Sequence, residues 1–255
     1  MSRRFHLADQ ILYEDDAIIA INKPAGLLVI PDRWDLDKPN LLALLKRREP
    51  TAKIYVVHRL DLGTSGVVLF AKTALVHQQL NYQLEHRQVV KEYHAVIQGQ
   101  LTHDGSIDLA IDKDPHRRGQ MRVCRGGKPS VTDYQIIEQF KGYTYVRLFP
   151  RTGRTHQIRV HLQALGYPLA IDPIYGKAKP IYLSEFKRDY RHKPDEPERP
   201  LIDRLTLHAA ALQFQHPLTG EQISLRAELP KDLRALLHAL RKYQSLPEFH
   251  SHQNT

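Results

Sequence analysis

The stretch that most constrains the fold of this chain is residues 58–66, His-Arg-Leu-Asp-Leu-Gly-Thr-Ser-Gly. Apolar runs with β character flank it at residues 54–57 and 67–70, so its polar side chains are expected at the ends of two core strands. Burying Asp61 costs the most free energy in this segment, because a carboxylate buried without a cation or hydrogen-bond donors is strongly destabilising. The segment therefore predicts either a structural ion pair of Arg59 with Asp61 or a working site.

The charge of the chain favours a polyanionic partner. Lys and Arg total 37 against 28 for Asp and Glu, a formal net charge of +9. Nucleic acid is the simplest such partner, although the same excess suits a basic protein kept in solution by its surface charge. The densest basic stretch, which predicts either a phosphate-contacting surface or a solvated loop, comprises Lys113, His116, Arg117, Arg118, Arg122, Arg125 and Lys128.

The composition is that of a soluble globular protein, with 42% hydrophobic and 25% charged residues. Cys124 is the only cysteine, which excludes an intramolecular disulfide and a thiolate metal cluster. The sequence shows neither a signal peptide nor an apolar run of membrane-spanning length, so we expect a cytoplasmic protein without membrane contact.

Hydrophobic patterning predicts a mixed α+β fold. Strands are expected on both sides of a turn at 22–26, within residues 11–29, and at 89–97, 131–138, 143–149, 205–214 and 221–226. Helices are expected from Asn40 to 45, from Thr73 to about 86, from 155 to about 165, and from near Pro230 to 240. Because strands and helices interleave without regular βαβ spacing, a largely antiparallel sheet with flanking helices is favoured.

The remaining segments complete the predicted organisation. Residues 100–130 are expected to form short strands and loops, and the charged, proline-rich stretch 177–204 a surface excursion. We therefore expect one domain over residues 1–246, followed by a disordered tail at 247–255.

Several common catalytic sites find no support in the motifs. His156 and His161 are five residues apart, off a common helix face, and no His, Asp or Glu cluster has ligand spacing, so we expect no metal. Ser65 has no G-x-S-x-G elbow, which argues against a serine hydrolase. Residues 64–66 lack the flanking glycines and lysine of a phosphate loop.

Four segments, in order, resemble the RluA-type pseudouridine synthases. Residues 22–26, Asn-Lys-Pro-Ala-Gly, are similar to the first motif of that family, and residues 58–66 to the second, which carries its catalytic aspartate. Residues 91–95, Lys-Glu-Tyr-His-Ala, resemble the segment with its active-site tyrosine. The stretch from Gly153 to Gly176 resembles the third motif. Any one of these similarities arises easily by chance, whereas four in order are specific.

The resemblance implies a pseudouridine synthase fold with a central cleft and roles for three residues. Asp61 is expected to be the essential carboxylate that isomerises uridine to pseudouridine in RNA, either by attacking C1′ or by removing a proton from C2′. Tyr93 is expected to stack on the target base and to supply its hydroxyl for proton transfer. Arg159 is expected to pair with Asp61 and to keep it ionised, which compensates the burial of the carboxylate.

Four further residues are expected to bind substrate. The resemblance implies that Ile158 packs against the base and that Arg59 replaces the flipped base in its stack or contacts phosphate. Arg154 is expected to contact substrate. Lys23 precedes a proline in extended geometry and is expected to present its ammonium to a phosphate or a carboxylate, although a solvated turn lysine is the commoner arrangement.

We therefore expect a monomeric, cofactor-independent synthase acting on ribosomal or transfer RNA. Many relatives carry a small N-terminal RNA-binding domain that this chain is expected to lack, so that RNA selection rests on residues 113–128 and 177–204. One alternative is a non-catalytic RNA-binding or ribosome-assembly factor that retains the fold. Another is a glycoside- or nucleotide-cleaving hydrolase, which needs a second carboxylate or a metal.

Overall fold

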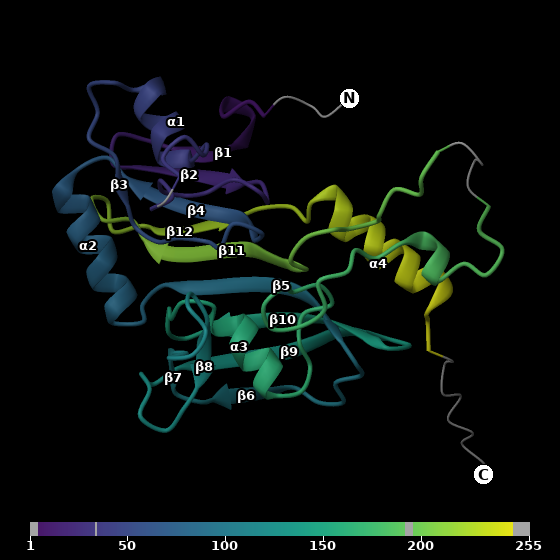
Figure 1. Cartoon of the computed structure of the whole chain (residues 1–255). Helices are drawn as coiled ribbons and strands as arrows, with labels where there is room; N and C mark the ends of the chain where they lie inside the picture. The colour runs from purple at the N-terminus through teal and green to yellow at the C-terminus, as the bar shows by residue number, and fades with distance from the viewer. Residues whose placement is uncertain (1–4, 34, 192–195, 247–255) are drawn as a thin grey trace, which may run out of the picture.

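One large sheet runs through the molecule (Figure 1). The structure, a computed structural model, describes residues 5–33, 35–191 and 196–246. Within them the strand order is β1-β2-β4-β11-β5-β10-β9-β6, with β3 paired to β4 and β12 to β11. The strands are β1 (Ile11–Glu14), β2 (Ile18–Lys23), β3 (Tyr55–Val56), β4 (Ser65–Ala71), β5 (Val90–Gln98), β6 (Gly105–Asp108), β9 (Val131–Phe140), β10 (Tyr143–Pro150), β11 (Leu207–Gln215) and β12 (Gln222–Arg226).

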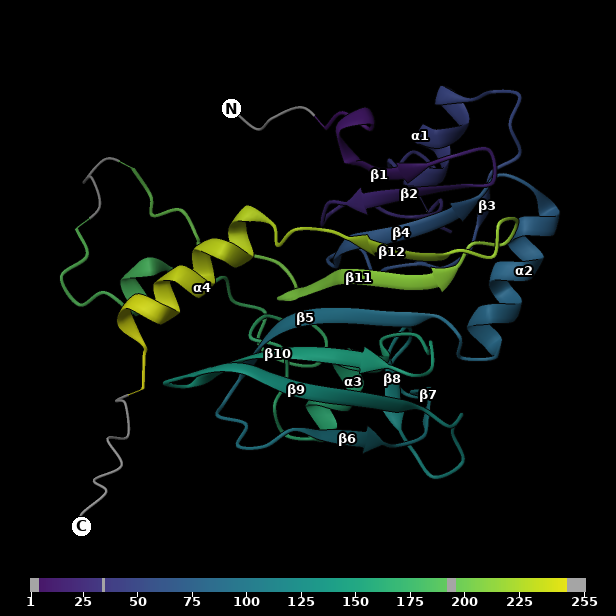
Figure 2. The same cartoon turned by 180° about the vertical axis from the view of Figure 1, so that it is seen from behind.

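Helices flank this sheet, with α2 at one end of its strands and α4 at the other (Figures 1 and 2). The helices are α1 (Leu41–Arg48), α2 (Ala74–Glu85), α3 (Gln157–Ala164) and α4 (Lys231–Tyr243), with short 3-10 turns at η1 (Ala8–Gln10) and η2 (Leu183–Glu185). A separate two-stranded hairpin, formed by β7 (Ile111–Lys113) and β8 (Met121–Val123), lies beside α3. In the described ranges, no helix combines the length and apolar character needed to cross a bilayer.

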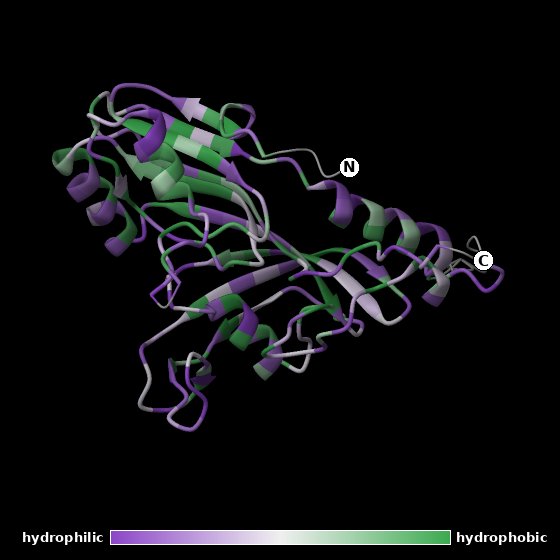
Figure 3. Cartoon of the chain, turned by 45° about the horizontal axis from the view of Figure 1, so that its top comes forward, coloured by the Kyte–Doolittle hydropathy of each residue, from purple (hydrophilic) through white to green (hydrophobic). Residues whose placement is uncertain are grey.

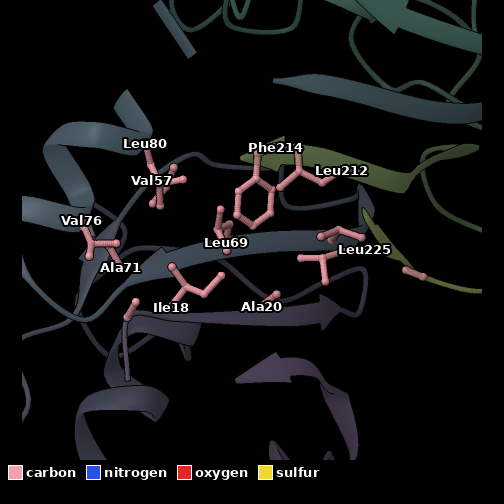
Figure 4. Close-up of a cluster of buried hydrophobic side chains, with 13 residues drawn as sticks. Ile18, Ala20, Val57, Leu69, Ala71, Val76, Leu80, Leu212, Phe214 and Leu225 are labelled. Atoms are coloured by element: carbon pink, nitrogen blue, oxygen red, sulfur yellow. The ribbon is translucent and has the colours of Figure 1, made fainter. Parts of the chain in front are cut away.

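In the half of the sheet nearest the N-terminus, β4 is buried along its whole length. Leu69 packs with Leu80 of α2 and Phe214 of β11 on one face, as Figure 4 shows. Phe70, the next residue, points to the other face and packs with Leu41 of α1. Helices on both faces therefore explain why this strand is a continuous apolar run rather than an alternating one.

The other half of the sheet is also covered on both faces. Leu148 of β10 packs with Ile158 of α3, whereas Tyr145 of the same strand faces the other side of the sheet and packs with Leu236 of α4. Figure 3 shows α4, at the right, with hydrophobic and hydrophilic residues alternating along it, as expected for a helix with one face on the core.

The two halves meet where β4 and β11 pair in parallel, next to Asp61. Ser65 lies opposite His208, and Gly66 opposite Ala209. Gly66 has a φ of +115°, and a Cβ there would lie 2.1 Å from the Ala209 carbonyl oxygen. Only glycine fits this position, so the Gly66 of residues 58–66 is needed for the joint between the halves.

The structure confirms the predicted α+β fold and most of its elements. Asn40 and Thr73 cap α1 and α2, accepting hydrogen bonds from the backbone N–H groups of Ala43 and Val76. The helix expected from residue 155 begins two residues later, as α3.

The prediction that a turn at 22–26 joins the first two strands is wrong. The turn lies between β1 and β2 at residues 15–17, where Asp15 Oδ1 accepts hydrogen bonds of 2.8 Å from the N–H groups of Ala17 and Ile18. This aspartate caps a tight turn through its side chain, whereas residues 22–26 lead away from β2 toward the cleft described below. The tail predicted at 247–255 lies outside the described residues.

Candidate active site

A cleft of about 960 Å³ opens along the joint between the two halves of the sheet. Its walls come from separate parts of the chain: the loops before β4, the end of α2 with β5, and the turn between β10 and α3. Six of the seven residues predicted to act on substrate line it, namely Arg59, Asp61, Tyr93, Arg154, Ile158 and Arg159. Asp61 and Arg159, which are 98 positions apart in the sequence, therefore share one cavity.

An arginine between two carboxylates forms the centre of this cleft. Arg159 Nη1 donates to Asp61 Oδ2 over 2.9 Å. The same guanidinium donates from Nε to Asp172 Oδ2 over 2.7 Å and from Nη2 to Asp172 Oδ1 over 2.8 Å. The side chain of Asp172 is fully buried, that of Arg159 is 4% exposed and that of Asp61 is 28% exposed. Asp61 is therefore the member of the group that a substrate can reach.

Charge compensation makes this burial possible. Burial disfavours the charged guanidinium, but Asp172 and Asp61 outweigh it and hold the pKa of Arg159 above its usual value. Burial likewise opposes ionisation of Asp172, yet its hydrogen bonds from Arg159 and from the N–H groups of Ile174 and Tyr175 keep the pKa of the carboxyl below its usual value. The pair is therefore ionised at neutral pH, with Nη1 held in place toward Asp61.

Tyr93 supplies a protonated phenol to the same cleft. It belongs to β5 and packs between the hydrophobic clusters of the two halves. Burial, with a contribution from the negative charge of Asp61, raises the pKa of its hydroxyl well above the usual value. The side chain thus presents an aromatic ring and a hydroxyl that remains a proton donor at neutral pH.

Comparisons with known proteins identify a family for this chain. The profile of the RNA pseudouridylate synthase family matches residues 17–164, which include Asp61 and Tyr93. The chain belongs to this family. It is 40% identical over 239 residues to the ribosomal large subunit pseudouridine synthase D of Neisseria meningitidis, covering 92% of this chain and 62% of that protein.

Further relatives extend the match. The ribosomal large subunit pseudouridine synthase D of Vibrio cholerae is 40% identical over 241 residues, 91% of this chain and 71% of that protein. The solved structure of human RNA pseudouridylate synthase domain containing 1 superposes with a TM-score of 0.67 at 27% identity, covering 94% of this chain and 98% of that one. The predicted fold class is thereby confirmed, and the chain spans less than two thirds of the Neisseria relative.

Within this member of the pseudouridylate synthase family, Lys23 does not lie where the sequence suggested. Its side chain is fully buried, outside the cleft. Its ammonium donates to the carbonyl oxygens of Pro24, Leu27 and Leu62 at 3.0, 2.8 and 3.3 Å. The predicted contact with substrate is therefore wrong for this position. Lys23 instead ties the loop after β2 to the residue that follows Asp61.

The other substrate-binding candidates divide into two kinds. Arg59 and Arg154 are exposed at the cleft, where a guanidinium can meet a phosphate. Ile158 is 6% exposed and belongs to the cluster under α3, so only its edge can touch a base.

Two residues near Asp61 were missed from the sequence. Asp172 lies within the stretch similar to the third family motif, but nothing local marks it as the partner of Arg159. His156, which the sequence analysis considered only as a metal ligand and set aside, lines the cleft with Nε2 3.9 Å from Asp61 Oδ1. The signal that marks both residues is a cluster of polar side chains around one carboxylate, and this cluster exists only after folding.

Proposed function

We propose that this chain is an RNA pseudouridine synthase in which Asp61 is the essential carboxylate. The observation that carries the proposal is the position of Asp61, partly exposed in a cleft with one oxygen bound to a buried Arg159 that Asp172 holds in place. An ionised carboxylate aimed into a cavity is what either form of the reaction requires, attack on C1′ or removal of a proton from C2′.

The reaction is balanced without a further reactant. The N1–C1′ bond breaks, the uracil turns within the cleft, and a C5–C1′ bond forms; the proton lost from C5 is matched by one gained at N1. The target base has to leave its stack, which costs a few kcal/mol, and the ring of Tyr93 offers a surface on which it can stack. The protonated hydroxyl of Tyr93 can take part in the transfer of protons to the base.

Ribosomal RNA of the large subunit is the substrate that we infer. The relatives from Neisseria and Vibrio are named for that subunit, and the net charge of +9 suits a polyanion of this size. Transfer RNA is the second candidate. We also propose that the chain acts as a monomer, since all the residues that line the cleft come from one chain, and that it acts in the cytoplasm, in keeping with a ribosomal substrate.

The proposal is tested by mapping pseudouridine in total RNA from cells that lack the gene. Wild type or Asp61→Asn is then reintroduced, together with Asp16→Asn, which changes an exposed aspartate in the β1–β2 turn as a matched control. We expect one or a few sites to disappear and to return with wild type and Asp16→Asn only. Full restoration by Asp61→Asn would overturn the catalytic assignment and favour the RNA-binding or assembly factor.

A further inference from the structure

His156 has a strained backbone at the edge of the cleft. It is the N-cap residue of α3 but has a φ of 54° in the left-handed region. Only one other non-glycine residue in the described ranges, Arg87, has a positive φ. A non-glycine residue is strained in this conformation because its Cβ crowds the backbone, and such outliers gather at functional sites. N-cap side chains ordinarily accept a backbone N–H, whereas the side chain of His156 makes no capping bond.

The hydroxyl of Tyr175 contacts one of the two ring nitrogens of His156. The hydroxyl of Tyr175 accepts a hydrogen bond from the backbone N–H of Met121 at 2.8 Å and lies 2.9 Å from His156 Nδ1. After accepting from Met121, the hydroxyl has its own proton to donate to Nδ1. Nδ1 is then the acceptor of the imidazole, which assigns the proton of neutral His156 to Nε2.

Nε2 is the nitrogen that faces Asp61. It lies 3.9 Å from Oδ1, the carboxylate oxygen that Arg159 does not bind. This distance exceeds that of a direct hydrogen bond, but catalytic contacts are often long before substrate is bound and shorten afterwards. An Nε2–H facing Oδ1 therefore complements the guanidinium on Oδ2, and a shorter contact would give the carboxylate a donor on each side.

The β7–β8 hairpin supports Tyr175 and, through it, His156. Met121, which bonds Tyr175, is the first residue of β8. Tyr175 is 6% exposed and packs with Ile111 of β7 and Val160 of α3, and Figure 1 shows the hairpin beside α3. Tyr175 also lies under the guanidinium of Arg159, with Cζ 5.0 Å from its ring centre. The hairpin, Tyr175 and His156 thus form a chain of contacts that ends at Asp61.

We propose that His156 is a positioning residue for Asp61, held by Tyr175 in the tautomer that aims Nε2–H at the free carboxylate oxygen, with the β7–β8 hairpin as the support of the pair. This inference rests on the proposed function for its effect on turnover. The pairing of His156 with Tyr175 and Asp61 is a property of the folded chain alone and can be measured without substrate.

Burial, more than the neighbouring charges, keeps His156 neutral. Burial lowers the pKa of its imidazole, Asp61 and Asp172 work in the opposite direction, and the positive charge of Arg159 lowers the pKa further. Tyr175 faces the ring edge-on, with the two ring centres 5.6 Å apart. A neutral imidazole with its proton on Nε2 acts as a dipole toward Asp61 and adds no second positive charge beside Arg159.

The first test is a histidine ¹H–¹⁵N correlation spectrum of labelled protein across pH, with the His156 signals assigned by their loss in His156→Gln. We expect the Nε2–H tautomer in wild type. Asp61→Asn should lower the titration midpoint of His156, because a negative charge is removed, and Tyr175→Phe should raise it, because the hydroxyl no longer favours an unprotonated Nδ1. An Nδ1–H tautomer in wild type, or a midpoint that Asp61→Asn leaves in place, overturns the pairing.

The second test measures single-turnover rate and RNA affinity. Tyr175→Phe and His156→Gln should each lower the rate about 10- to 100-fold with RNA affinity within about twofold of wild type. Tyr145→Phe is the matched control, since Tyr145 places its hydroxyl 2.6 Å from Nδ1 of another histidine, His94, outside the cleft. It should keep the wild-type rate.

The two tests separate two kinds of failure. A wild-type chain that makes no pseudouridine refutes the proposed function, while the spectra still decide the pairing. An active wild type whose Tyr175→Phe variant turns over at the same rate refutes the positioning role itself. Thermal unfolding of each variant checks that it is folded at the assay temperature, so that a lower turnover rate is not caused by unfolding.

Discussion

Asp172 accepts two parallel hydrogen bonds of 2.7 and 2.8 Å from Nε and Nη2 of Arg159. Nη1 of the same guanidinium is thereby left to donate to Asp61. Bidentate pairs of this kind fix direction as well as charge. Asp172 is not among the residues that line the cleft, so its effect on the candidate catalytic carboxylate passes through Arg159.

We therefore expect Asp172→Asn to reduce stability and turnover together. Removing one partner of a buried pair costs about 3–5 kcal/mol, and Arg159 is then free to turn away from Asp61. Urea unfolding and a single-turnover assay measure the two effects. Asp232→Asn is the control: it breaks the bidentate pair with Arg204, at 2.6 and 2.7 Å, but Asp232 is 34% exposed, so a cost of about 1 kcal/mol or less is expected. Equal losses in the two variants would contradict the special role of Asp172.

Tyr93→Phe should separate turnover from binding. The ring that can stack on a base remains, whereas the protonated hydroxyl is lost, so we expect the rate to fall about 100-fold or more with little change in RNA affinity. Gel-shift titration and a single-turnover assay give the two quantities. Tyr134→Phe, at another buried tyrosine of the sheet, should change neither. Parallel loss of rate and affinity in Tyr93→Phe would show that the hydroxyl acts in binding.

Lys23 should make stability rise with pH above neutrality. Burial lowers the pKa of its ammonium to about 7, against the opposing charge of Asp61, while an unfolded lysine titrates at about 10. Between these values the unfolded chain binds more protons than the folded one, so the unfolding free energy rises by up to about 1.4 kcal/mol per pH unit. Below pH 7 the folded chain carries the full cost of the buried charge.

Urea unfolding from pH 7 to 9 compares wild type with Lys23→Met and with Lys141→Met, which changes an exposed lysine in the β9–β10 turn. The difference between wild type and Lys23→Met should shift in favour of wild type as pH rises. The difference between wild type and Lys141→Met should stay flat. A flat result for Lys23→Met would mean that the lysine stays charged in the folded chain.

Arg122 of the β7–β8 hairpin should contribute to RNA affinity through a phosphate. It is exposed, and loss of one phosphate contact lowers the slope of log affinity against log salt by about 0.7–0.9. We expect Arg122→Ala to show this change with an unaltered rate at saturating RNA. Lys231→Ala, at the exposed start of α4, is the control, and filter binding at several salt concentrations is the measurement. An unchanged slope for Arg122→Ala would remove the hairpin from the RNA surface.

Gly66→Ala should be strongly destabilising. The φ of +115°, together with the Ala209 carbonyl oxygen only 2.1 Å from where a Cβ would stand, leaves no room for a side chain, so we expect a loss of more than about 3 kcal/mol. Gly126→Ala is the matched control, because a Cβ there meets nothing within 4 Å, and it should stay within about 0.5 kcal/mol of wild type. Thermal or urea unfolding measures both losses. A small effect at Gly66 would refute the close backbone approach of β4 to β11 at this position.

Signals that act over a few residues were sufficient for much of the fold. Asn40 and Thr73 cap their helices through their own side chains, and the apolar spacing along α4 buries Leu233, Leu236 and Leu240. The first hairpin was placed wrongly because Asp15 and Asn22 are both good turn residues. The pairing of β1 with β2 shows that the chain turns at Asp15, and the pairing of Asn22 with Val67 of β4 shows that Asn22 lies within a strand.

The sequence by itself determined the kind of fold, the basic character of the chain and, through motifs similar to a known family, the residues on which its chemistry is expected to depend. The tertiary structure alone decided how those residues are held: Arg159 by Asp172, His156 by Tyr175, and the loop beside Asp61 by Lys23. The physical reason is that burial and hydrogen-bond partners come from residues far apart in the chain. A lysine or histidine is the same residue in the sequence whether it lies on a solvent-exposed turn or in the buried interior. Its charge, the orientation of its side chain and its role depend on which of these environments surrounds it.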